Sequence, residues 1–336
     1  MKRTLTPVRL ILGGLAVLLV AAVVLWLVPS NSYLLLPDTA RAVAPLVTVP
    51  KTRNKDDDRG EIFFLAVLVR KANLLERLFP TVRDDGATLV PAEALRPPGV
   101  SERAQRKIDE HDMSESQSIA AAVALRALGY KVIADRNGAE IADIVPGMPS
   151  VGKLEPSEVV VSVDGRPVRT PADLRRLIRE RKPGDSVRLG VRNSRGLRTV
   201  ELRTRNEDGH PVIGVIIDQS ANIKLPFPVR IRAGSVVGPS AGLAFALEIM
   251  EKLGHNVDRG YKVAATGELQ LDGTVLPIGG VKQKIFEAKN SHVDILLVPA
   301  GDNAAEARRF AGSVRVIPVN SFQQALRQLA TFPAKA

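Results

Sequence analysis

The chain has 336 residues, which at about 100–200 residues per domain predicts two or three domains. It contains no cysteine and only four histidines, which excludes disulfides, Cys-ligated zinc, iron–sulfur clusters and a catalytic thiol. The formal net charge is +11, but only 4% of the residues are aromatic, which argues against base-stacking platforms. We therefore predict a solvated basic surface with no metal, no cofactor and no nucleic-acid partner.

The amino-terminal segment has the pattern of a membrane anchor. Residues 10–28 form an uncharged, apolar run of 19 residues, which as a helix would span about 28 Å. Lys2, Arg3 and Arg9 precede this run and favour a cytoplasmic N-terminus. A cleaved signal peptide is the alternative, but its apolar region would be shorter and would end at a better cleavage site. We expect residues 1–29 to anchor the protein in the lipid bilayer as a single-pass protein of the cytoplasmic membrane, with the remainder extracytoplasmic.

Residues 30–127 form a membrane-proximal region without a sharp motif. The apolar run Ile62–Val69 predicts a buried strand, and Ala72–Phe79 predicts a helix that stops before a proline. Ser101–Leu128 predicts a long helix that ends at a glycine.

Residues 128–206 change to short alternating strands around one helix. The strands are expected at Tyr130–Ala134, Glu140–Ile144, Val159–Val163 and Ser186–Val191, and the helix at Pro171–Arg181. The sequence IADIVPGMPS…GKLEPSEVVVSVDGRPV…DLRRLIRERKPGDSVRLGVR resembles a PDZ domain of the bacterial HtrA type. The resemblance implies that this domain binds peptide or protein segments by adding a strand to a sheet edge.

The matching carboxylate-binding loop of the PDZ-like domain would consist of five consecutive residues: Leu128, Gly129, Tyr130, Lys131 and Val132. Their backbone N–H groups would receive a peptide carboxylate. Gly129 is equally well explained as the cap of the preceding helix.

Residues 207–336 alternate between strands and helices, which predicts an α/β domain and makes the whole chain an α/β (α+β) multidomain protein. Helices are expected at Ala241–Leu253, Val281–Asn290, Asn303–Phe310 and from Ser321 to Leu329. Strands are expected at Val212–Ile217, Val229–Ile231, Tyr261–Ala265, Leu269–Leu271, Thr274–Leu276, Ile295–Val298 and Val314–Val319.

The sharpest local feature is the pentapeptide GPSAG at residues 238–242. It sets Ser240 at a strand-to-helix turn, where backbone N–H groups at a helix start can hold an oxyanion. A simple N-cap serine is the alternative. The segment also fits the G-x-S-x-G motif of Ser-His-Asp hydrolases, but only His255 and His292 follow it, and neither stands where that fold requires the base.

A serine nucleophile without histidine needs another base, and a buried lysine can serve because burial favours its neutral form. Lys282 and Lys284 both open the predicted helix 281–290. Helical spacing places Lys284 at the margin of the apolar face of Val281, although Phe286 on the Lys282 side weakens this distinction. The alternative for either residue is an exposed surface lysine.

The segments GPSAGLAFALEIM and TGELQLDGTVLPIGGVKQKIFEA together resemble the proteolytic domain of the Lon family, which consists of Ser–Lys dyad endopeptidases. The resemblance implies Ser240 as nucleophile and Lys284 as base. The supporting residues that it implies are Thr266, which holds the lysine amine, Glu268 of the same turn, and Gly238 and Ala241 beside the serine.

The chain has no G-x-x-x-x-G-K-[ST] motif, so we expect proteolysis that does not depend on ATP. The arrangement resembles that of bacterial membrane-bound, PDZ-containing Lon-like proteases. The resemblance further implies a homo-oligomer, expected to be a hexamer. The alternative function is a non-catalytic membrane adaptor, in which the PDZ domain accompanies an inactive protease domain.

Overall fold

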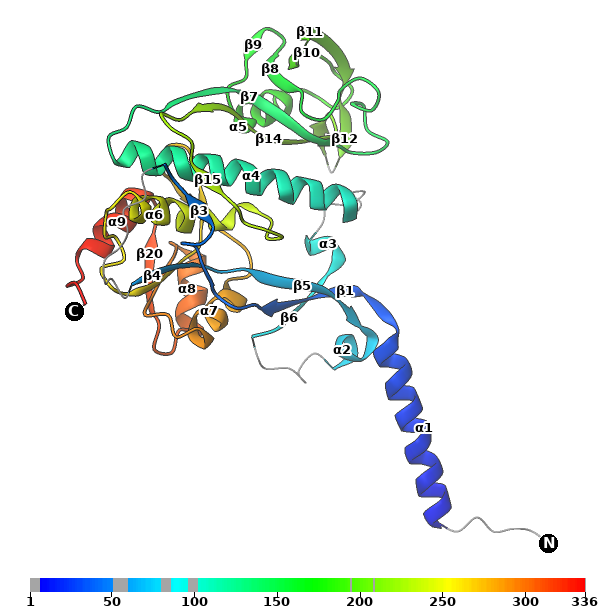
Figure 1. Ribbon diagram of the computed structural model, residues 1–336. Helices are drawn as coiled ribbons and strands as arrows, with labels where there is room; N and C mark the ends of the chain where they lie inside the picture. The colour runs from blue at the N-terminus through cyan, green and yellow to red at the C-terminus, as the bar shows by residue number, and fades with distance from the viewer. Residues whose placement is uncertain are drawn as a thin grey trace.

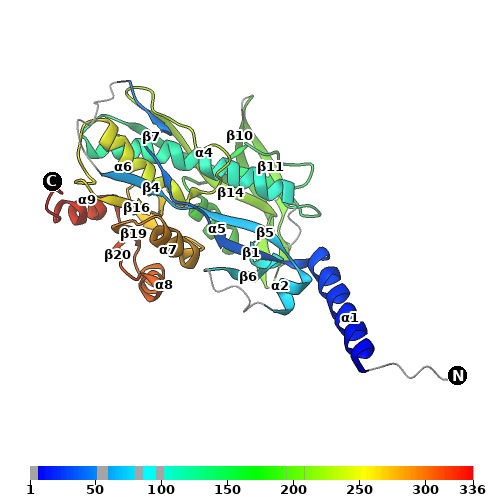
Figure 2. The ribbon, with the colours of Figure 1, turned by 60° about the horizontal axis from the view of Figure 1, so that its bottom comes forward.

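A computed structural model describes residues 7–50, 60–79, 86–95, 102–193, 195–207 and 209–335. The first residues of the predicted anchor segment, 1–6, lie outside the described residues. Helix α1 (Pro7–Leu27) projects away from the body of the protein in both ribbon views (Figures 1 and 2). Within the described part of the chain, no helix combines the length and the apolar character needed to cross a membrane.

The PDZ-like part is built on a six-stranded sheet with the strand order β11-β10-β8-β7-β14, and β9 pairs with β8 at its side. Its strands are β7 (Ile133–Ile144), β8 (Val159–Val163), β9 (Arg166–Pro167), β10 (Ser186–Asn193), β11 (Gly196–Arg203) and β14 (Val215–Lys224). A short ribbon of β12 (Arg205–Glu207) and β13 (His210–Val212) precedes β14.

Strand β7 differs from the prediction because it is one continuous strand where the sequence suggested two. It pairs antiparallel with β14 over its whole length, from the pair Ile144 and Val215 to the pair Ile133 and Lys224. The sheet of the PDZ-like part therefore includes residues beyond 206.

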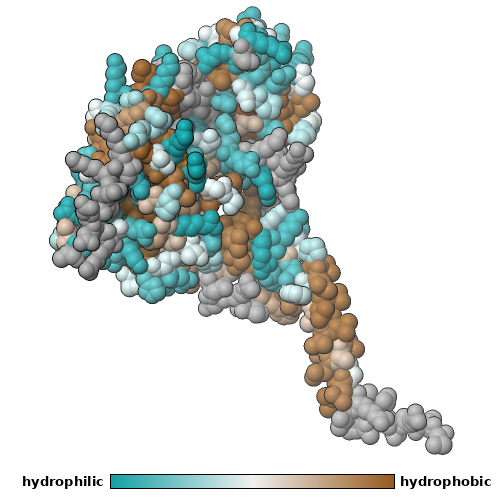
Figure 3. Space-filling view, viewed as in Figure 1, coloured by the Kyte–Doolittle hydropathy of each residue, from teal (hydrophilic) through white to brown (hydrophobic). Residues whose placement is uncertain are grey.

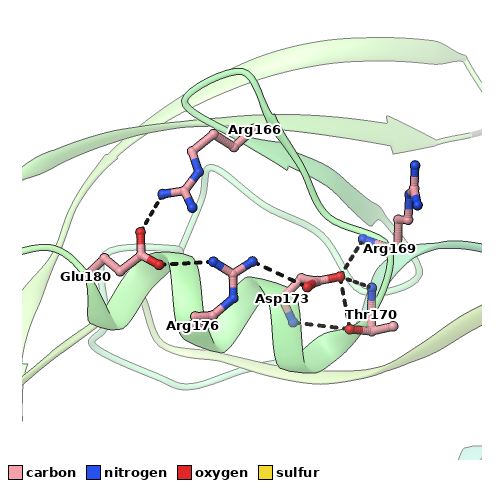
Figure 4. A network of polar contacts seen from close by, with 6 residues as sticks. All are labelled: Arg166, Arg169, Thr170, Asp173, Arg176 and Glu180. Carbon is pink, nitrogen blue, oxygen red and sulfur yellow. Dashed lines mark hydrogen bonds and ion pairs between the residues drawn. The ribbon is translucent and has the colours of Figure 1, made fainter.

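Helix α5 (Pro171–Arg179) packs its apolar face on this sheet and begins with a complete capping box. The backbone N–H of Asp173 donates to Thr170 Oγ1, and the Asp173 carboxylate accepts from the Thr170 backbone N–H. Figure 4 shows this cap beside the exposed pairs of Glu180 with Arg166 and Arg176. Such exposed pairs contribute little stability, so the cap and the buried face fix the helix.

The second sheet has five strands in the order β2-β4-β16-β19-β20. They are β2 (Arg41–Ala42), β4 (Glu61–Phe64), β16 (Lys262–Ala265), β19 (Ile295–Pro299) and β20 (Arg315–Val319). Strands β4, β16, β19 and β20 run parallel, and β2 is antiparallel to β4. The region before residue 127 therefore supplies two strands to the sheet of the C-terminal part.

Two hydrophobic cores lie on opposite faces of this sheet, as expected for parallel strands that are covered on both sides. Phe64 of β4 belongs to the core formed with α4 (Glu102–Ala127), α6 (Gly242–Lys252) and α9 (Phe322–Ala330). Its neighbour Phe63 points to the other core, formed with α7 (Val281–Asn290) and α8 (Asp302–Phe310).

Helix α4 lies between the PDZ-like sheet and the C-terminal part (Figure 1). Its second half is rich in alanine, and residues Ala120, Ala121, Ala122 and Ala124 are buried against α6 and its surroundings. These small side chains let the two helices approach closely, which ties α4 to the segment that carries Ser240.

The predicted strand Ile62–Val69 is divided in the structure, because Leu65 and Ala66 separate β4 from β5 (Val67–Asn73). Strand β5 belongs to a three-stranded sheet with the order β5-β1-β6, together with β1 (Pro29–Pro37) and β6 (Thr88–Pro91).

The remaining elements are short. They are α2 (Leu74–Leu78), α3 (Ala92–Leu95), the pair β3 (Val47–Thr48) and β15 (Arg230–Ile231), the hairpin β17 (Glu268–Leu269) and β18 (Val275–Leu276), and the 3-10 turn η2 (Pro239–Ala241).

Candidate active site

Ser240 lies in the middle of η2, and α6 begins immediately after this turn. The turn starts at Gly238, whose φ of 89° is accessible to glycine but strained for residues with a side chain. The Gly238 backbone N–H donates to the carbonyl of Asp109 at 2.9 Å, and Ser116 Oγ donates to the carbonyl of Pro239 at 3.0 Å. Helix α4 therefore holds the start of the turn that presents the serine.

Lys284 reaches Ser240 from α7. Its Nζ lies 2.8 Å from Ser240 Oγ and 2.8 Å from Thr266 Oγ1, and the lysine residue is only 3% exposed. The structure thus brings together three of the predicted site residues from three separate segments.

Thr266 is fixed by its own backbone and is 1% exposed. Its N–H donates to the carbonyl of Leu297 at 3.0 Å, and its hydroxyl lies 3.3 Å from the carbonyl of Ser240. The next amide, that of Gly267, donates to the same Ser240 carbonyl at 2.8 Å. The end of β16 therefore positions both the lysine amine and the backbone of the serine.

Burial changes the charge balance of the lysine. Loss of solvent lowers the pKa of Lys284 from 10.5 to about 8, against the opposing effect of the charge of Glu287. A substantial fraction of the amine is consequently neutral just above neutral pH. A neutral amine at hydrogen-bond distance from a hydroxyl can act as its general base.

The other lysine of the pair, Lys282, points elsewhere. Its Nζ donates to the carbonyl of Ala87 at 3.2 Å and lies 5.7 Å from the centre of the Phe310 ring. Helical spacing therefore predicted correctly that Lys284 is the more buried of the two lysines. Phe286, the apolar residue on the Lys282 side of the helix, is only half-buried.

The remaining supporting residues take different places. Ala241 is 3% exposed and directly precedes α6, so its small side chain fills a tight position beside the serine. Glu268 accepts a hydrogen bond from Gln270 Nε2 at 2.9 Å within the β17 turn. That contact holds the turn that follows Thr266. Among the described residues, no group of three His, Asp or Glu side chains is arranged to hold a metal ion.

The predicted carboxylate-binding loop closes the end of α4. The N–H of Gly129 donates to the carbonyl of Arg126, the N–H of Tyr130 donates to that of Leu125, both at 2.9 Å, and Gly129 has a φ of 80°. These are the two hydrogen bonds of a Schellman cap. The N–H of Leu128 also donates to the carbonyl of Ala124, at 3.2 Å. Three of the five amides assigned to a peptide carboxylate are therefore already used, which favours the alternative explanation of Gly129 as a helix cap. The ring of Tyr130 packs edge-on against Phe227, with ring centres 5.2 Å apart.

Two features of the site have no signal in the sequence. One is Gln283, which is 2% exposed and donates from Nε2 to the carbonyl of Gly86 at 2.7 Å and to Thr88 Oγ1 at 2.8 Å. The other is a groove of about 1130 Å³ between β5, α4 and the residues 233–237 that lead into the serine turn. Both depend on contacts between segments that lie far apart in the chain.

Comparisons with known proteins agree with this organisation. Residues 217–330 match the family profile described as the Lon protease (S16) C-terminal proteolytic domain, and residues 126–204 match that of the PDZ domain. The chain is 36% identical over 112 residues to Lon protease 2 of Bacillus subtilis, which covers 33% of this chain and 19% of that protein. It is 41% identical over 90 residues to the Lon protease of Roseiflexus castenholzii, which covers 26% of this chain and 11% of that protein.

Among solved structures, the PDZ domain of the SdrC-like protein from Listeria monocytogenes has 17% sequence identity and a TM-score of 0.23, over 24% of this chain and 87% of that one. The chain spans less than a fifth of the length of the curated relatives named above. The two family matches show that the chain contains a Lon-type proteolytic domain and a PDZ domain, in a mixed α/β arrangement.

Proposed function

We propose that this protein is a serine endopeptidase in which Ser240 is the nucleophile and Lys284 is the general base. The observation that carries the proposal is the buried amine of Lys284, 2.8 Å from both the Ser240 and Thr266 hydroxyls. The match of residues 217–330 to a proteolytic domain supports it.

In the first step, neutral Lys284 takes the hydroxyl proton of Ser240 while Oγ forms a bond to the peptide carbonyl carbon. The carbonyl electrons move to its oxygen, and we assign the stabilisation of this oxyanion to backbone N–H groups at the start of α6. The amide of Gly238 is committed to Asp109, and Pro239 has no N–H, so the donors are expected at Ser240 and beyond.

In the second step, the Lys284 ammonium gives its proton to the leaving amine as the C–N bond breaks. Water then attacks the ester carbon, and Lys284 accepts the proton of the water. The bond from this carbon to Ser240 Oγ breaks, Lys284 returns the proton to Oγ, and the acid product leaves. The groove between β5 and α4 ends beside the serine turn, and we assign it to the substrate chain.

The test is cleavage of an unfolded protein, such as reduced casein, by the purified full-length chain. We expect Ser240→Ala and Lys284→Ala to lose at least about a hundredfold in kcat/KM, since each removes a reacting group. Lys282→Ala is the matched control on the same helix and should keep most of the activity. Equal turnover by the unmodified chain and both dyad variants would instead leave the non-catalytic adaptor as the explanation.

We further propose that this proteolysis does not require ATP, because the sequence contains no phosphate-binding motif of the Walker type. Casein cleavage by the purified chain should proceed at the same rate after nucleotide and Mg²⁺ are removed. A rate that rises severalfold on addition of ATP would contradict this.

We also propose that α1 attaches the protein to the cytoplasmic membrane, with the N-terminus inside and the catalytic part outside. Support comes from the hydrophobic surface of this helix (Figure 3) and from the basic residues before it in the sequence. Its exposed apolar side chains include Leu18 at 71% and Trp26 at 62%. Because the chain has no cysteine, Thr4→Cys and Ser313→Cys give two clean labelling sites. An impermeant maleimide applied to intact cells should label only the second, and labelling of neither would contradict the proposal.

The PDZ domain is proposed to recruit protein or peptide substrates or to gate their access to the site. Helix α4 supports this role, because it carries the PDZ sheet at one end and contacts the Gly238 and Pro239 backbone along its length. A homo-oligomer, expected to be a hexamer from the family resemblance, remains a prediction that light scattering of the purified protein would test.

A further inference from the structure

Glu287 is a buried acid that the proposed reaction does not use. It lies three residues after Lys284 on α7, so the two side chains leave the same face of the helix on adjacent turns. The residue is fully buried, with 0% exposure. An acid in such a place is costly unless its charge is compensated or its proton is retained.

The hydrogen bonds of this carboxyl are few. Oε1 accepts from the Ala66 N–H at the long distance of 3.4 Å, and Oε2 has no hydrogen-bond partner within the described parts of the chain. A glutamine would fill the same volume and satisfy the same amide without burying an acid. Packing and hydrogen bonding alone therefore do not account for an ionisable carboxyl at residue 287.

The charged groups that face this carboxyl come from two directions. Lys284 lies on its own helix, while Asp38 and Arg41 lie on the segment from β1 to β2 and form an ion pair with each other at 2.7 Å. The connection between β4 and β5 contributes only the backbone of Ala66. The charges of Asp38 and Arg41 nearly cancel each other. Lys284 is therefore the group whose charge Glu287 can balance.

We propose that Glu287 is a positioning residue of the Ser240–Lys284 site, whose carboxylate compensates the ammonium that forms on Lys284 during the attack. This inference rests on the proposed function. When Ser240 Oγ bonds to the carbonyl carbon, its proton moves to Lys284 Nζ and a positive charge appears where water is excluded. The carboxylate stabilises that charge and neither gives nor takes a proton in the step.

The resting site must then lose two protons to become fully competent. Burial raises the pKa of Glu287 to about 8, against the lowering effects of the Ala66 N–H and of Lys284, and burial lowers that of Lys284 to about 8. The two groups titrate as a coupled pair. Below pH 8 the logarithm of kcat/KM should fall with a slope approaching two, because both the amine and the carboxyl become protonated.

The experiment compares the pH profile of casein cleavage for the unmodified full-length chain and for Glu287→Gln between pH 6 and 9.5. The variant keeps the Ala66 hydrogen bond but has no titrating carboxyl, so the acidic side of its pH profile should have a slope of one. The midpoint of this side should lie at lower pH, because the charge of Glu287 no longer raises the pKa of Lys284. Its plateau kcat should fall about tenfold or more with KM little changed, since only the transition-state charge is affected. The ratio of variant to unmodified activity should therefore rise as the pH falls.

Two further variants separate this role from a structural one. Glu287→Asp retains an ionisable group and should keep the steep limb, which also preserves the test if Glu287→Gln fails to fold. Glu251→Gln removes another buried carboxyl, one that accepts from the backbone N–H groups of Val257 and Asp258, and should leave the slope at two.

Parallel profiles for the unmodified chain and Glu287→Gln would overturn the inference while leaving the dyad intact. Failure of the proposed function looks different, because the unmodified chain would then cleave no faster than Ser240→Ala. In that case NMR titration of ¹³Cε-labelled lysine still decides the inference, since the Lys284 signal should titrate at lower pH in Glu287→Gln. An unchanged Lys284 midpoint would overturn it.

Discussion

The burial of Lys284 predicts a specific dependence of stability on pH. Burial lowers the pKa of this amine from 10.5 to about 8, while the unfolded chain keeps the ordinary value. Between these values the unfolded state binds the proton more tightly than the folded state. Stability from the neutral amine is therefore present above pH 10.5 and is lost as the pH falls to about 8. At about 1.4 kcal/mol for each tenfold change in proton affinity, the loss is about 3 kcal/mol.

Lys284→Met removes this contribution, because methionine fills a similar volume without a charge. The difference in unfolding free energy between the variant and the unmodified chain should therefore move in favour of the variant by about 3 kcal/mol between pH 10.5 and pH 8. The two hydrogen bonds lost to Ser240 and Thr266 cost about 1 kcal/mol each at every pH and do not alter this change.

The assay is urea denaturation of the full-length chain in mild detergent, followed by far-ultraviolet circular dichroism at closely spaced pH values. Glu287 titrates together with Lys284, so both proteins carry Glu287→Gln in this assay, and the remaining titrating groups cancel in the difference. Lys262→Met, at the exposed start of β16, is the control and should give a constant difference. A difference for Lys284→Met that stays within about 1 kcal/mol from pH 8 to 10.5 would refute the burial of the amine and, with it, the argument for a neutral base.

Two smaller changes test the supporting contacts. Thr266→Val removes the hydroxyl that contacts Lys284 Nζ but keeps the shape of the side chain, and it should lower kcat for casein about tenfold or more with little change in KM. An unchanged kcat would mean that the hydroxyl does not orient the amine. Gly129→Ala forces a side chain into a φ of 80° at the end of α4, and urea denaturation should show a loss of about 1 kcal/mol. No loss would mean that the cap is absent in solution.

Much of the local structure was predictable because its signals lie within a few residues. The helix at Val281–Asn290 and the strand at Val159–Val163 have the bounds that the sequence indicated. The former follows Gly280, which adopts a φ of 70° directly before it. Spacing along that helix also favoured Lys284 over Lys282, since it placed one amine nearer the apolar face.

Pairing between distant segments was not predictable in this way. The residues of β4 predict a buried strand. Nothing in Ile62–Phe64, however, indicates that this strand pairs with β16, some two hundred residues later in the chain. The predicted bounds of β7 were wrong for a related reason. Because β7 pairs with β14 from Ile133 to Ile144, residues of the two expected strands and the residues between them form one strand. A strand is defined by its neighbours, and the neighbours here come from elsewhere in the chain.

The carboxylate-binding loop shows a different limit. A glycine after a long helix is compatible both with a cap and with a backbone that receives an anion, because each uses exposed amides. Only the hydrogen bonds decide between them, and those of Gly129 and Tyr130 run back to α4.

Residues of α7 on either side of Lys284 are held by a region outside the segment that matches the proteolytic domain. On α7, Gln283 is held by Gly86 and Thr88, and Glu287 by Ala66. A side chain at Gly280 would meet Val67 Cγ2 at 2.7 Å, so β5 packs tightly against the start of the helix.

All of these partners lie between residues 60 and 95, and β4 from the same region borders β16, which leads to Thr266. A fragment of residues 207–336 would keep Ser240 and Lys284 and lose these contacts to α7. Since desolvation is the main cause of the lowered pKa of Lys284, we expect the pKa of this amine to rise toward its ordinary value if the fragment admits water to it. The amino-terminal region therefore supports the helix that carries Lys284, and we predict that the catalytic unit is larger than the sequence match.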